Sequence, residues 1–257
     1  MLLALDVGNT HIVVGFMEGM EIKYTSRIST NRLATEMEYA ITLETLMKIA
    51  EIDDTLIDAA IISSVVPQIN NTLERAVKMA TGLDAMVVGS GIKTGVNILL
   101  DDPAEAGSDL VVAAAGALHF YEPPLILIDM GTATTVTVVD KNGAFRGGAI
   151  IPGMGLSLNA LTANTSLLPS VSFEAPDRVI CTNTVDCMKS GCVYGTVYML
   201  DGMIDHMEAE LGEKATVIAT GGLSKKIVPL CSHEIVESED LLLYGLAVIY
   251  AKNQKKK

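Results

Sequence analysis

The sequence lacks the cysteine patterns of secreted and zinc-binding proteins. Its four cysteines include no Cys-x-x-Cys pair, and a disulfide framework is not indicated. Three of them, Cys181, Cys187 and Cys192, could be drawn as a zinc site, but their spacing matches no common pattern. We therefore expect reduced, structural thiols.

Long apolar runs and excess basic charge are also missing. No run reaches the roughly 18 residues that a membrane helix needs, and the N-terminus leads into Asp6 without the basic flank of a signal peptide. Basic residues number 18 against 31 acidic ones, so the net charge of −13 argues against a general nucleic-acid surface. We expect a cytoplasmic protein that binds neither nucleic acid nor membrane.

Motifs of nucleophilic hydrolases are absent as well. There is no G-x-S-x-G sequence, and the four histidines are dispersed without the spacing of a triad or a metal site. What remains is an apolar fraction of 49% in 257 residues, enough for a substantial core in one large domain or two ordinary ones.

Two copies of one turn motif are the strongest positive signal. Each copy is a short apolar run, an Asp, one spacer, a Gly, and then small residues with hydrogen-bonding side chains. The first contains Asp6 and Gly8, and the second contains Asp129 and Gly131. A glycine after a strand-end acid lets the backbone approach a phosphate, to which following N–H groups and side chains donate. Side chains of this kind are Asn9, Thr10, Thr132 and Thr134.

The duplication predicts two half-molecules that close on one polyphosphate, as in a nucleotide-dependent phosphotransferase or ATPase. The two acids would repel phosphate directly, so they make sense if a cation lies between, or if they position water on it. A third turn, Thr220-Gly221-Gly222, follows a late strand. It can be an ordinary tight turn. We favour a second interpretation, in which the two glycines, having no side chains, let a flat adenine ring lie against the backbone.

The hydrophobic pattern predicts two similar halves. Each begins with three strands, at 2–7, 10–17 and 21–28 in the first half and at 125–130, 133–140 and 144–150 in the second. Further strands are expected at 59–66, 85–88 and 216–219, and helices at 36–50, 68–81, 103–121, 184–211 and 239–252. An irregular stretch is expected at 165–183. We place the boundary between an N-terminal half, 1–117, and a C-terminal half, 118–257.

Asp109 is a further carboxylate of interest, because the helix that follows it is apolar. An acid at a helix start can simply favour the helix dipole and cap free N–H groups. It can also face a cleft and accept a proton from a substrate hydroxyl during phosphoryl transfer. Spacing alone leaves both interpretations open.

These motifs together resemble type III pantothenate kinases over essentially the whole chain, within the actin/hexokinase/Hsp70 ATPase superfamily. The matching segments are 6–11, 107–109, 129–134, 148–153, 183–184 and 220–222. The resemblance implies an α/β fold of two duplicated ribonuclease-H-like or actin-like ATPase domains, each a mixed sheet flanked by helices. It also implies ATP-dependent phosphorylation of the primary hydroxyl of pantothenate, the first committed step towards coenzyme A.

The resemblance also implies residue roles. Asp109 would be the proton acceptor, Asp129 would bind an activating monovalent cation (K⁺ or NH₄⁺), and Asp6 would lie near the Mg²⁺ that accompanies ATP. Such kinases are homodimers, with the pantothenate pocket near the subunit interface. Residues implied to bind ATP are Asp6, Val7, Gly8, Asn9, Thr10, His11, Ile12, Val13, Thr132, Gly221 and Gly222. Residues implied to bind pantothenate are Gly107, Ser108, Asp109, Leu110 and Thr184.

One position departs from the family pattern. The residue after the proton acceptor is commonly Arg, which would pair with the pantothenate carboxylate, whereas this chain has Leu110. Losing a charge-assisted contact costs roughly 1.5–3 kcal/mol. Lys93 is a candidate replacement donor by loop position, although a solvated loop lysine is the plainer interpretation. The departure motivates an alternative function, a catalytically weak nucleotide-binding regulator of the same fold.

Overall fold

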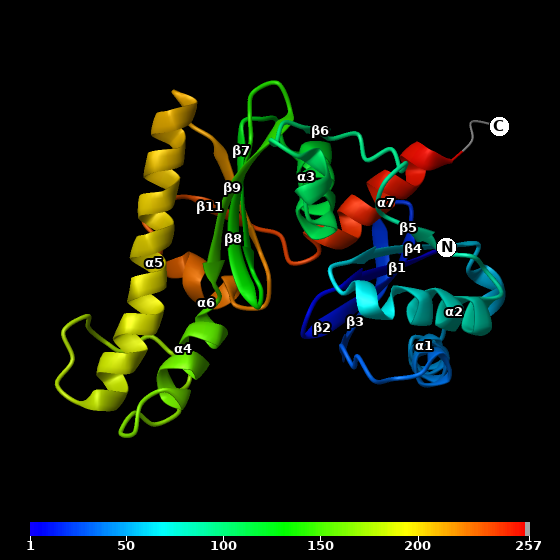
Figure 1. The fold of residues 1–257 in the computed structure, drawn as a ribbon. Coiled ribbons are helices and arrows are strands. Elements are labelled where there is room, and N and C mark those ends of the chain that lie inside the picture. The colour runs from blue at the N-terminus through cyan, green and yellow to red at the C-terminus, as the bar shows by residue number, and fades with distance from the viewer. Residues whose placement is uncertain (255–257) are drawn as a thin grey trace. The chain divides into compact units, whose positions relative to one another are not determined.

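The computed structural model describes residues 1–254, which form two compact units (Figure 1). Unit 1 comprises Met1–Val96, Asp102–His119 and the described part of Leu241–Lys257. Unit 2 comprises Asn97–Asp101 and Phe120–Asp240. These units differ from the predicted halves, 1–117 and 118–257, mainly in two segments. Asn97–Asp101 belongs to unit 2, and the closing helix, from Leu241, belongs to unit 1. The predicted boundary, which concerns the duplication, stays a prediction.

The sheet of unit 1 has the order β3-β2-β1-β4-β5. Central strand β1 pairs antiparallel with β2 and parallel with β4. Alternate residues of β1 contribute to two apolar clusters, so the strand is buried on both faces and reads as a continuous apolar run. The strand bounds are β1 Leu2–Val7, β2 His11–Glu18, β3 Glu21–Ser29, β4 Ala59–Ser64 and β5 Met86–Val87.

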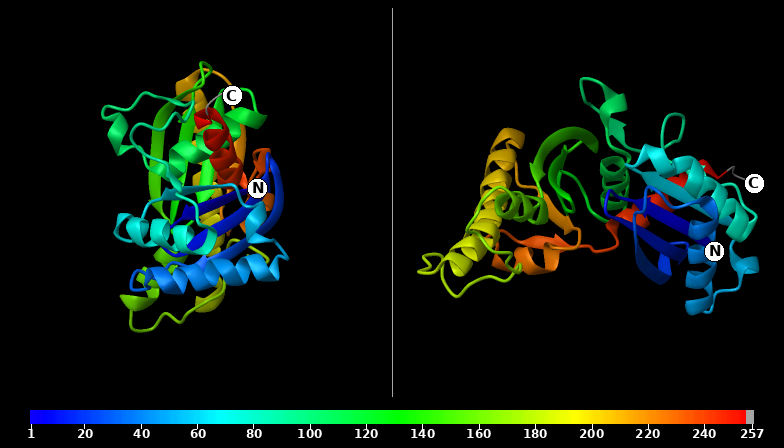
Figure 2. Two further views of the ribbon diagram at one scale, coloured as in Figure 1. Left: turned by 90° about the vertical axis from the view of Figure 1, so that its right-hand side faces the viewer. Right: turned by 60° about the horizontal axis from the view of Figure 1, so that its bottom comes forward.

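Two pairs of helices accompany this sheet. Helices α1 (Glu36–Ile49) and α2 (Asn70–Thr81) lie side by side and share one apolar cluster with β1 (Figure 2). Helices α3 (Ser108–Phe120) and α7 (Leu241–Asn253) contribute to the other cluster. These two helices approach closely, because a Cβ at Gly116 would meet backbone atoms of Leu241 and Gly245.

The sheet of unit 2 has the order β11-β10-β7-β8-β9-β6. Strand β7 pairs antiparallel with β8 and parallel with β10, as β1 does with β2 and β4. Helix α5 packs against one face of this sheet through a shared apolar cluster. The strand bounds are β6 Asn97–Ile98, β7 Leu125–Met130, β8 Ala133–Val139, β9 Ala144–Pro152, β10 Thr216–Thr220 and β11 Ile235–Glu237. The helices are α4 Met154–Ala163, α5 Thr184–Leu211 and α6 Ser224–Ile227.

The duplicated strand order confirms the α/β architecture of two similar mixed sheets flanked by helices. Short elements were missed: β6 and β11 have two and three residues, too few to show a period. The predicted helix 103–121 is also wrong at its start, because Pro103–Glu105 forms a separate 3₁₀ turn before α3 begins at Ser108. Within residues 1–254, no helix combines the length and apolar character needed to span a membrane.

Candidate active site

The turn after β1 is held by hydrogen bonds that leave its side chains exposed. The Gly8 N–H donates to the His11 carbonyl at 2.9 Å, and Thr30 Oγ1 donates to the Gly8 carbonyl at 2.7 Å. The Thr30 N–H donates to the Thr10 carbonyl at 2.9 Å. Asn9 and Thr10 are exposed on this fixed turn. The turn therefore presents preorganised polar groups, as phosphate binding requires.

A cation that sequence reasoning missed joins this turn. Arg32 Nη2 donates to Asn9 Oδ1 at 2.9 Å, and the guanidinium is exposed. Arginine presents several N–H donors in a planar fork that suits phosphate oxygens. Arg32 follows β3, far from Asn9 in sequence, so only the pairing of β2 with β3 brings it here.

Hydrogen bonds place Asp6 and the start of α3 at one edge of the unit 1 sheet. Asp6, which is half-buried, lies level with Ser63 on β4. Ser63 Oγ donates to Ser108 Oγ at 3.2 Å, and Ser108 Oγ donates to the Ser64 carbonyl at 3.0 Å. The structure thus brings the predicted residues 107–110 to the carboxyl end of β4, beside the strand that carries Asp6.

Asp109 has the electrostatics of a proton acceptor. Burial raises the pKa of its carboxyl above the ordinary value, although hydrogen bonding from the Leu110 N–H, donated to Oδ1 at 2.8 Å, opposes the shift. A carboxylate whose pKa is raised is a stronger base. A side chain at position 107 would displace this carboxylate, because a Cβ at Gly107 would lie 2.5 Å from Asp109 Oδ1. Both open interpretations have support, since the carboxylate accepts a first-turn N–H and is also desolvated.

The turn after β7 in unit 2 resembles the turn after β1, but different hydrogen bonds hold it. The Gly131 N–H donates to the Ala133 carbonyl at 3.0 Å, as Gly8 does to His11. The Gly153 N–H donates to the Thr132 carbonyl at 3.1 Å, and any Cβ at Gly153 would collide with that carbonyl. Thr132 is exposed and Thr134 is buried, so of these two threonines only Thr132 presents its side chain to solvent.

The third turn lies beside the second. Thr220 on β10 is level with Asp129 on β7. Gly221 has φ +95°, and a Cβ there would lie 2.6 Å from backbone atoms of Met130. Only glycine fits this position, and Gly222 after it is exposed. Unit 2 therefore carries Asp129 and a surface of bare backbone at the same edge of its sheet.

Thr184 lies elsewhere in unit 2, in the first turn of α5. Asn183 caps the helix by accepting the Asp186 N–H at 2.9 Å. Thr184 lines a cavity of ≈ 870 Å³ that is largely apolar and also includes Thr134. Apolar and thiol side chains among the other lining residues are Ile151, Pro152, Met154, Leu161, Leu168, Cys181, Cys187, Met188, Cys192 and Met199.

Two further sequence expectations concern side chains outside these turns. The backbone of Lys93 is fixed to the end of α7, because its N–H donates to Asn253 Oδ1 at 3.1 Å and its carbonyl accepts from Asn253 Nδ2 at 2.9 Å. The Lys93 side chain is exposed, in keeping with a solvated loop lysine. The four cysteines, all within the described part of the chain, are free thiols.

Solved structures share this fold at low sequence identity. A Baf family transcriptional activator from Campylobacter jejuni superposes with a TM-score of 0.60 at 15% identity, covering 98% of each chain. The inorganic polyphosphate/ATP-glucomannokinase of Arthrobacter sp. strain KM gives a TM-score of 0.52 at 13% identity, covering 98% of this chain and 99% of that one. These likenesses show the fold alone and confirm the predicted class.

Comparison of sequences is more specific. The protein of Geobacillus sp. (strain WCH70) named type III pantothenate kinase is 42% identical over 257 residues, which cover 100% of both chains. The protein of that name from Geobacter sulfurreducens is 41% identical over 255 residues, 99% of this chain and 100% of the relative. The sequence model described as type III pantothenate kinase matches residues 2–206. The chain belongs to the type III pantothenate kinase family.

Proposed function

We propose that this chain transfers the γ-phosphoryl group of ATP to the primary hydroxyl of pantothenate, the first step of coenzyme A biosynthesis. Family membership supplies the substrate class. The observation that carries the chemistry is the half-buried Asp109, whose pKa is raised by burial, at the sheet edge that also carries Asp6. A base and a phosphate turn on one edge are what phosphoryl transfer to an alcohol needs.

Asp109 accepts the proton of the pantothenate hydroxyl as the oxygen attacks the γ-phosphorus. General-base catalysis of this kind contributes about 10²–10⁴-fold to the rate. Alignment of the two substrates and electrostatic stabilisation of the phosphoryl oxygens supply the remainder. The hydrogen bond from the Leu110 N–H to Oδ1 orients the carboxylate.

The turn after β1 binds the ATP phosphates through residues 6–13. The backbone N–H groups, the Asn9 amide, the Thr10 hydroxyl and the Arg32 guanidinium are the donors on this turn. The Asp6 carboxylate suits Mg²⁺, which prefers oxygen ligands and binds through one or two carboxylates plus substrate phosphates. When bound, Mg²⁺ neutralises charge on the β- and γ-phosphates.

The edge of unit 2 serves the nucleotide and a monovalent cation. Thr132 contacts ATP, and Gly221 and Gly222 offer bare backbone to the adenosine. The Asp129 carboxylate is an anionic oxygen group, which is chemically suited to K⁺ or NH₄⁺. Family resemblance supports this assignment. Asp129 has the same position on β7 that Asp6 has on β1, and Asp6 is likewise proposed to lie near a cation.

Pantothenate is bound by residues 107–110 and Thr184. The protein is a cytoplasmic homodimer. Unit 2 has exposed apolar side chains on α4, α5 and the segment between them, which also line the cavity with Thr184, and exposed apolar surface is typical of an interface. Exposed apolar residues of α4, α5 and the segment between them are Leu156, Leu161, Leu167, Val179, Ile180, Val185 and Tyr198.

A coupled assay for ADP tests the function. We expect ADP release that requires pantothenate and is stimulated by potassium or ammonium salts relative to sodium salts. An Asp129→Asn variant should lose the response to potassium while remaining folded. Nucleotide binding without any pantothenate-dependent ADP release would instead favour the regulator, which Leu110 alone motivates.

A further inference from the structure

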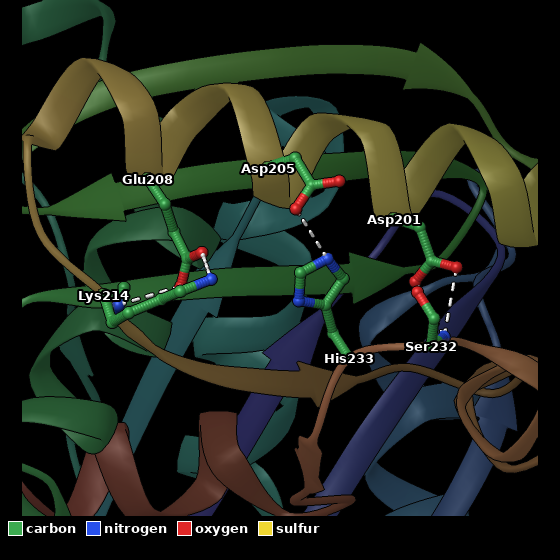
Figure 3. Close-up of polar contacts among 7 residues, drawn as sticks. Asp201, Asp205, Glu208, Lys214, Ser232 and His233 are labelled. Atoms are coloured by element: carbon green, nitrogen blue, oxygen red, sulfur yellow. Dashed lines mark hydrogen bonds and ion pairs between the residues drawn. The ribbon is translucent and has the colours of Figure 1, made fainter.

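Three side chains that the proposed function leaves unused gather in unit 2 (Figure 3). Asp205 and Glu208 lie on α5, and His233 lies in the segment that leads into β11. Each offers one ligand atom, and these atoms all lie within 4.8 Å of one another. His233 Nε2 is 3.1 Å from Asp205 Oδ1. In Figure 3 the imidazole of His233 faces the Asp205 carboxylate, and Glu208 lies to one side of it.

The helix places its acids on one face. Positions 201, 205 and 208 are separated by four and three residues, the spacing that stacks side chains along a helix. Asp201 accepts the Ser232 N–H on both carboxylate oxygens at 3.0 Å. That contact fixes the backbone of Ser232 on α5, and so places the neighbouring His233 beside the helix.

The Glu208 carboxylate is also fixed by hydrogen bonds. Its side chain is only 9% exposed, and its two oxygens accept from Lys214 Nζ at 2.6 Å and from the Ala215 N–H at 3.1 Å. Each carboxylate oxygen can accept more than one partner, so both retain capacity for a cation. Partners that orient a ligating carboxylate in this way are the usual surroundings of protein metal ligands.

We propose that Asp205, Glu208 and His233 form a binding site for a divalent transition-metal ion of the Zn²⁺ type. Bonds of about 2.0–2.2 Å in a tetrahedral zinc site put neighbouring ligand atoms about 3.3–3.6 Å apart. The separation of 3.1 Å between His233 Nε2 and Asp205 Oδ1 is slightly shorter than that spacing, and one ligand atom of Glu208 lies within 4.8 Å of those of the other two residues. An imidazole among the ligands favours zinc over Mg²⁺ and Ca²⁺, which prefer all-oxygen sites.

The ion would join α5 to the strand edge that supports the third turn. His233 leads into β11, which pairs parallel with β10, and β10 ends at the Thr220-Gly221-Gly222 turn. The site lies within unit 2 and has none of the residues proposed for catalysis. We therefore expect the ion to stabilise the fold and leave basal kinase activity unchanged. Without an ion, the same groups form a His–Asp pair and a Glu–Lys pair.

Thermal unfolding of the chelator-treated, full-length protein tests the site. With Zn²⁺ alone at about one hundred times its Kd, the Tm should rise by roughly 5–10 °C. The same concentration of Mg²⁺ should give no comparable rise. The variants His233→Gln and Asp205→Asn should lose the zinc-dependent shift. His206→Gln is the matched control, because His206 lies on the same helix and is no member of the cluster.

Direct binding distinguishes this site from the thiols and from a folding defect. Calorimetric titration with Zn²⁺ should show one site lost in Asp205→Asn, a variant of an exposed residue whose Tm without metal should match that of the wild type. Substitution with Co²⁺ should give no thiolate-to-metal charge-transfer band. A wild-type protein without a zinc-dependent shift, a shift retained in His233→Gln, or a thiolate band would each overturn the proposal.

Discussion

The turns after β1 and β7 begin from one motif but are completed by different neighbours. In unit 1, side chains complete the turn: Thr30 donates to the Gly8 carbonyl, and Arg32 donates to Asn9. In unit 2, backbone completes it: the Gly153 N–H donates to the Thr132 carbonyl. Beside it, Gly221 packs on the backbone of Met130. Duplication has kept the strands and the glycine, while each copy has acquired its own surroundings.

The difference matches the division of chemistry that we propose. Unit 1 carries the charged and desolvated groups, Arg32 and Asp109, that phosphoryl transfer needs. Unit 2 carries close-packed glycines that leave backbone bare for a flat ligand. Substitutions in unit 1 should therefore change turnover, and substitutions at the glycines of unit 2 should change stability and nucleotide affinity.

The largest expected effect is that of Asp109→Asn on turnover. An amide cannot accept the hydroxyl proton, so kcat should fall by about 10²–10⁴-fold. Asp102→Asn is the matched control, because Asp102 is an exposed acid of the same segment that caps a 3₁₀ turn through the Ala104 N–H. Wild-type turnover in Asp109→Asn would contradict the assignment of the base.

The same substitution should stabilise the fold in a pH-dependent way. Burial raises the folded-state pKa of Asp109 above its ordinary value of 3.8, so the ionised form is the disfavoured one. Below pH 3.8 both proteins carry a neutral side chain and should have similar stability. As pH rises through the raised pKa, the wild type loses stability relative to Asp109→Asn. Thermal unfolding across pH checks this, and a variant less stable at neutral pH would contradict the burial argument.

Gly221→Ala tests the backbone surface of unit 2. Its Cβ would overlap Met130 at a φ of +95°, and together these should cost roughly 2–5 kcal/mol of the free energy of unfolding. Gly212→Ala separates strain from overlap, since Gly212 also has positive φ but open space around it. Gly8→Ala in unit 1 should cost less, because its Cβ would lie 3.1 Å from the His11 carbonyl. Urea unfolding of the three variants gives the order, and equal losses would remove the contrast between the turns.

Leu110→Arg asks whether unit 1 lacks a partner for the substrate carboxylate. A guanidinium at this position could form a charge-assisted contact, so the KM for pantothenate should fall by about one to two decades. Leu110→Met preserves an apolar side chain and should leave KM near the wild-type value. If the arginine variant leaves KM unchanged, another donor already binds the carboxylate.

Local sequence patterns predicted much of this fold, but they could not predict contacts between segments that are distant in the sequence. The predicted limits of one helix, 184–211, match α5, which Asn183 caps at its start and Gly212 ends in the left-handed conformation. The two sheets followed from duplicated strand runs. The contact of Arg32 with Asn9 and the link from Ser63 to Ser108 depend on how strands and helices pack, and no short motif encodes them. The resemblance supplied site roles that spacing alone left open.

The smallest effect that we expect is that of Thr30→Val in the unit 1 turn. Valine keeps the β-branched shape but removes the donor to the Gly8 carbonyl, so the free energy of unfolding should fall by about 0.5–1.5 kcal/mol. The KM for ATP should rise as the turn loses its fixed shape, with kcat less affected. Thr25→Val on β3, the strand that Thr30 follows, is the control, because Thr25 is exposed and lies away from the turn. A turn held by its backbone bonds alone would leave both variants alike, and the contrast between side-chain support in unit 1 and backbone support in unit 2 would then be wrong.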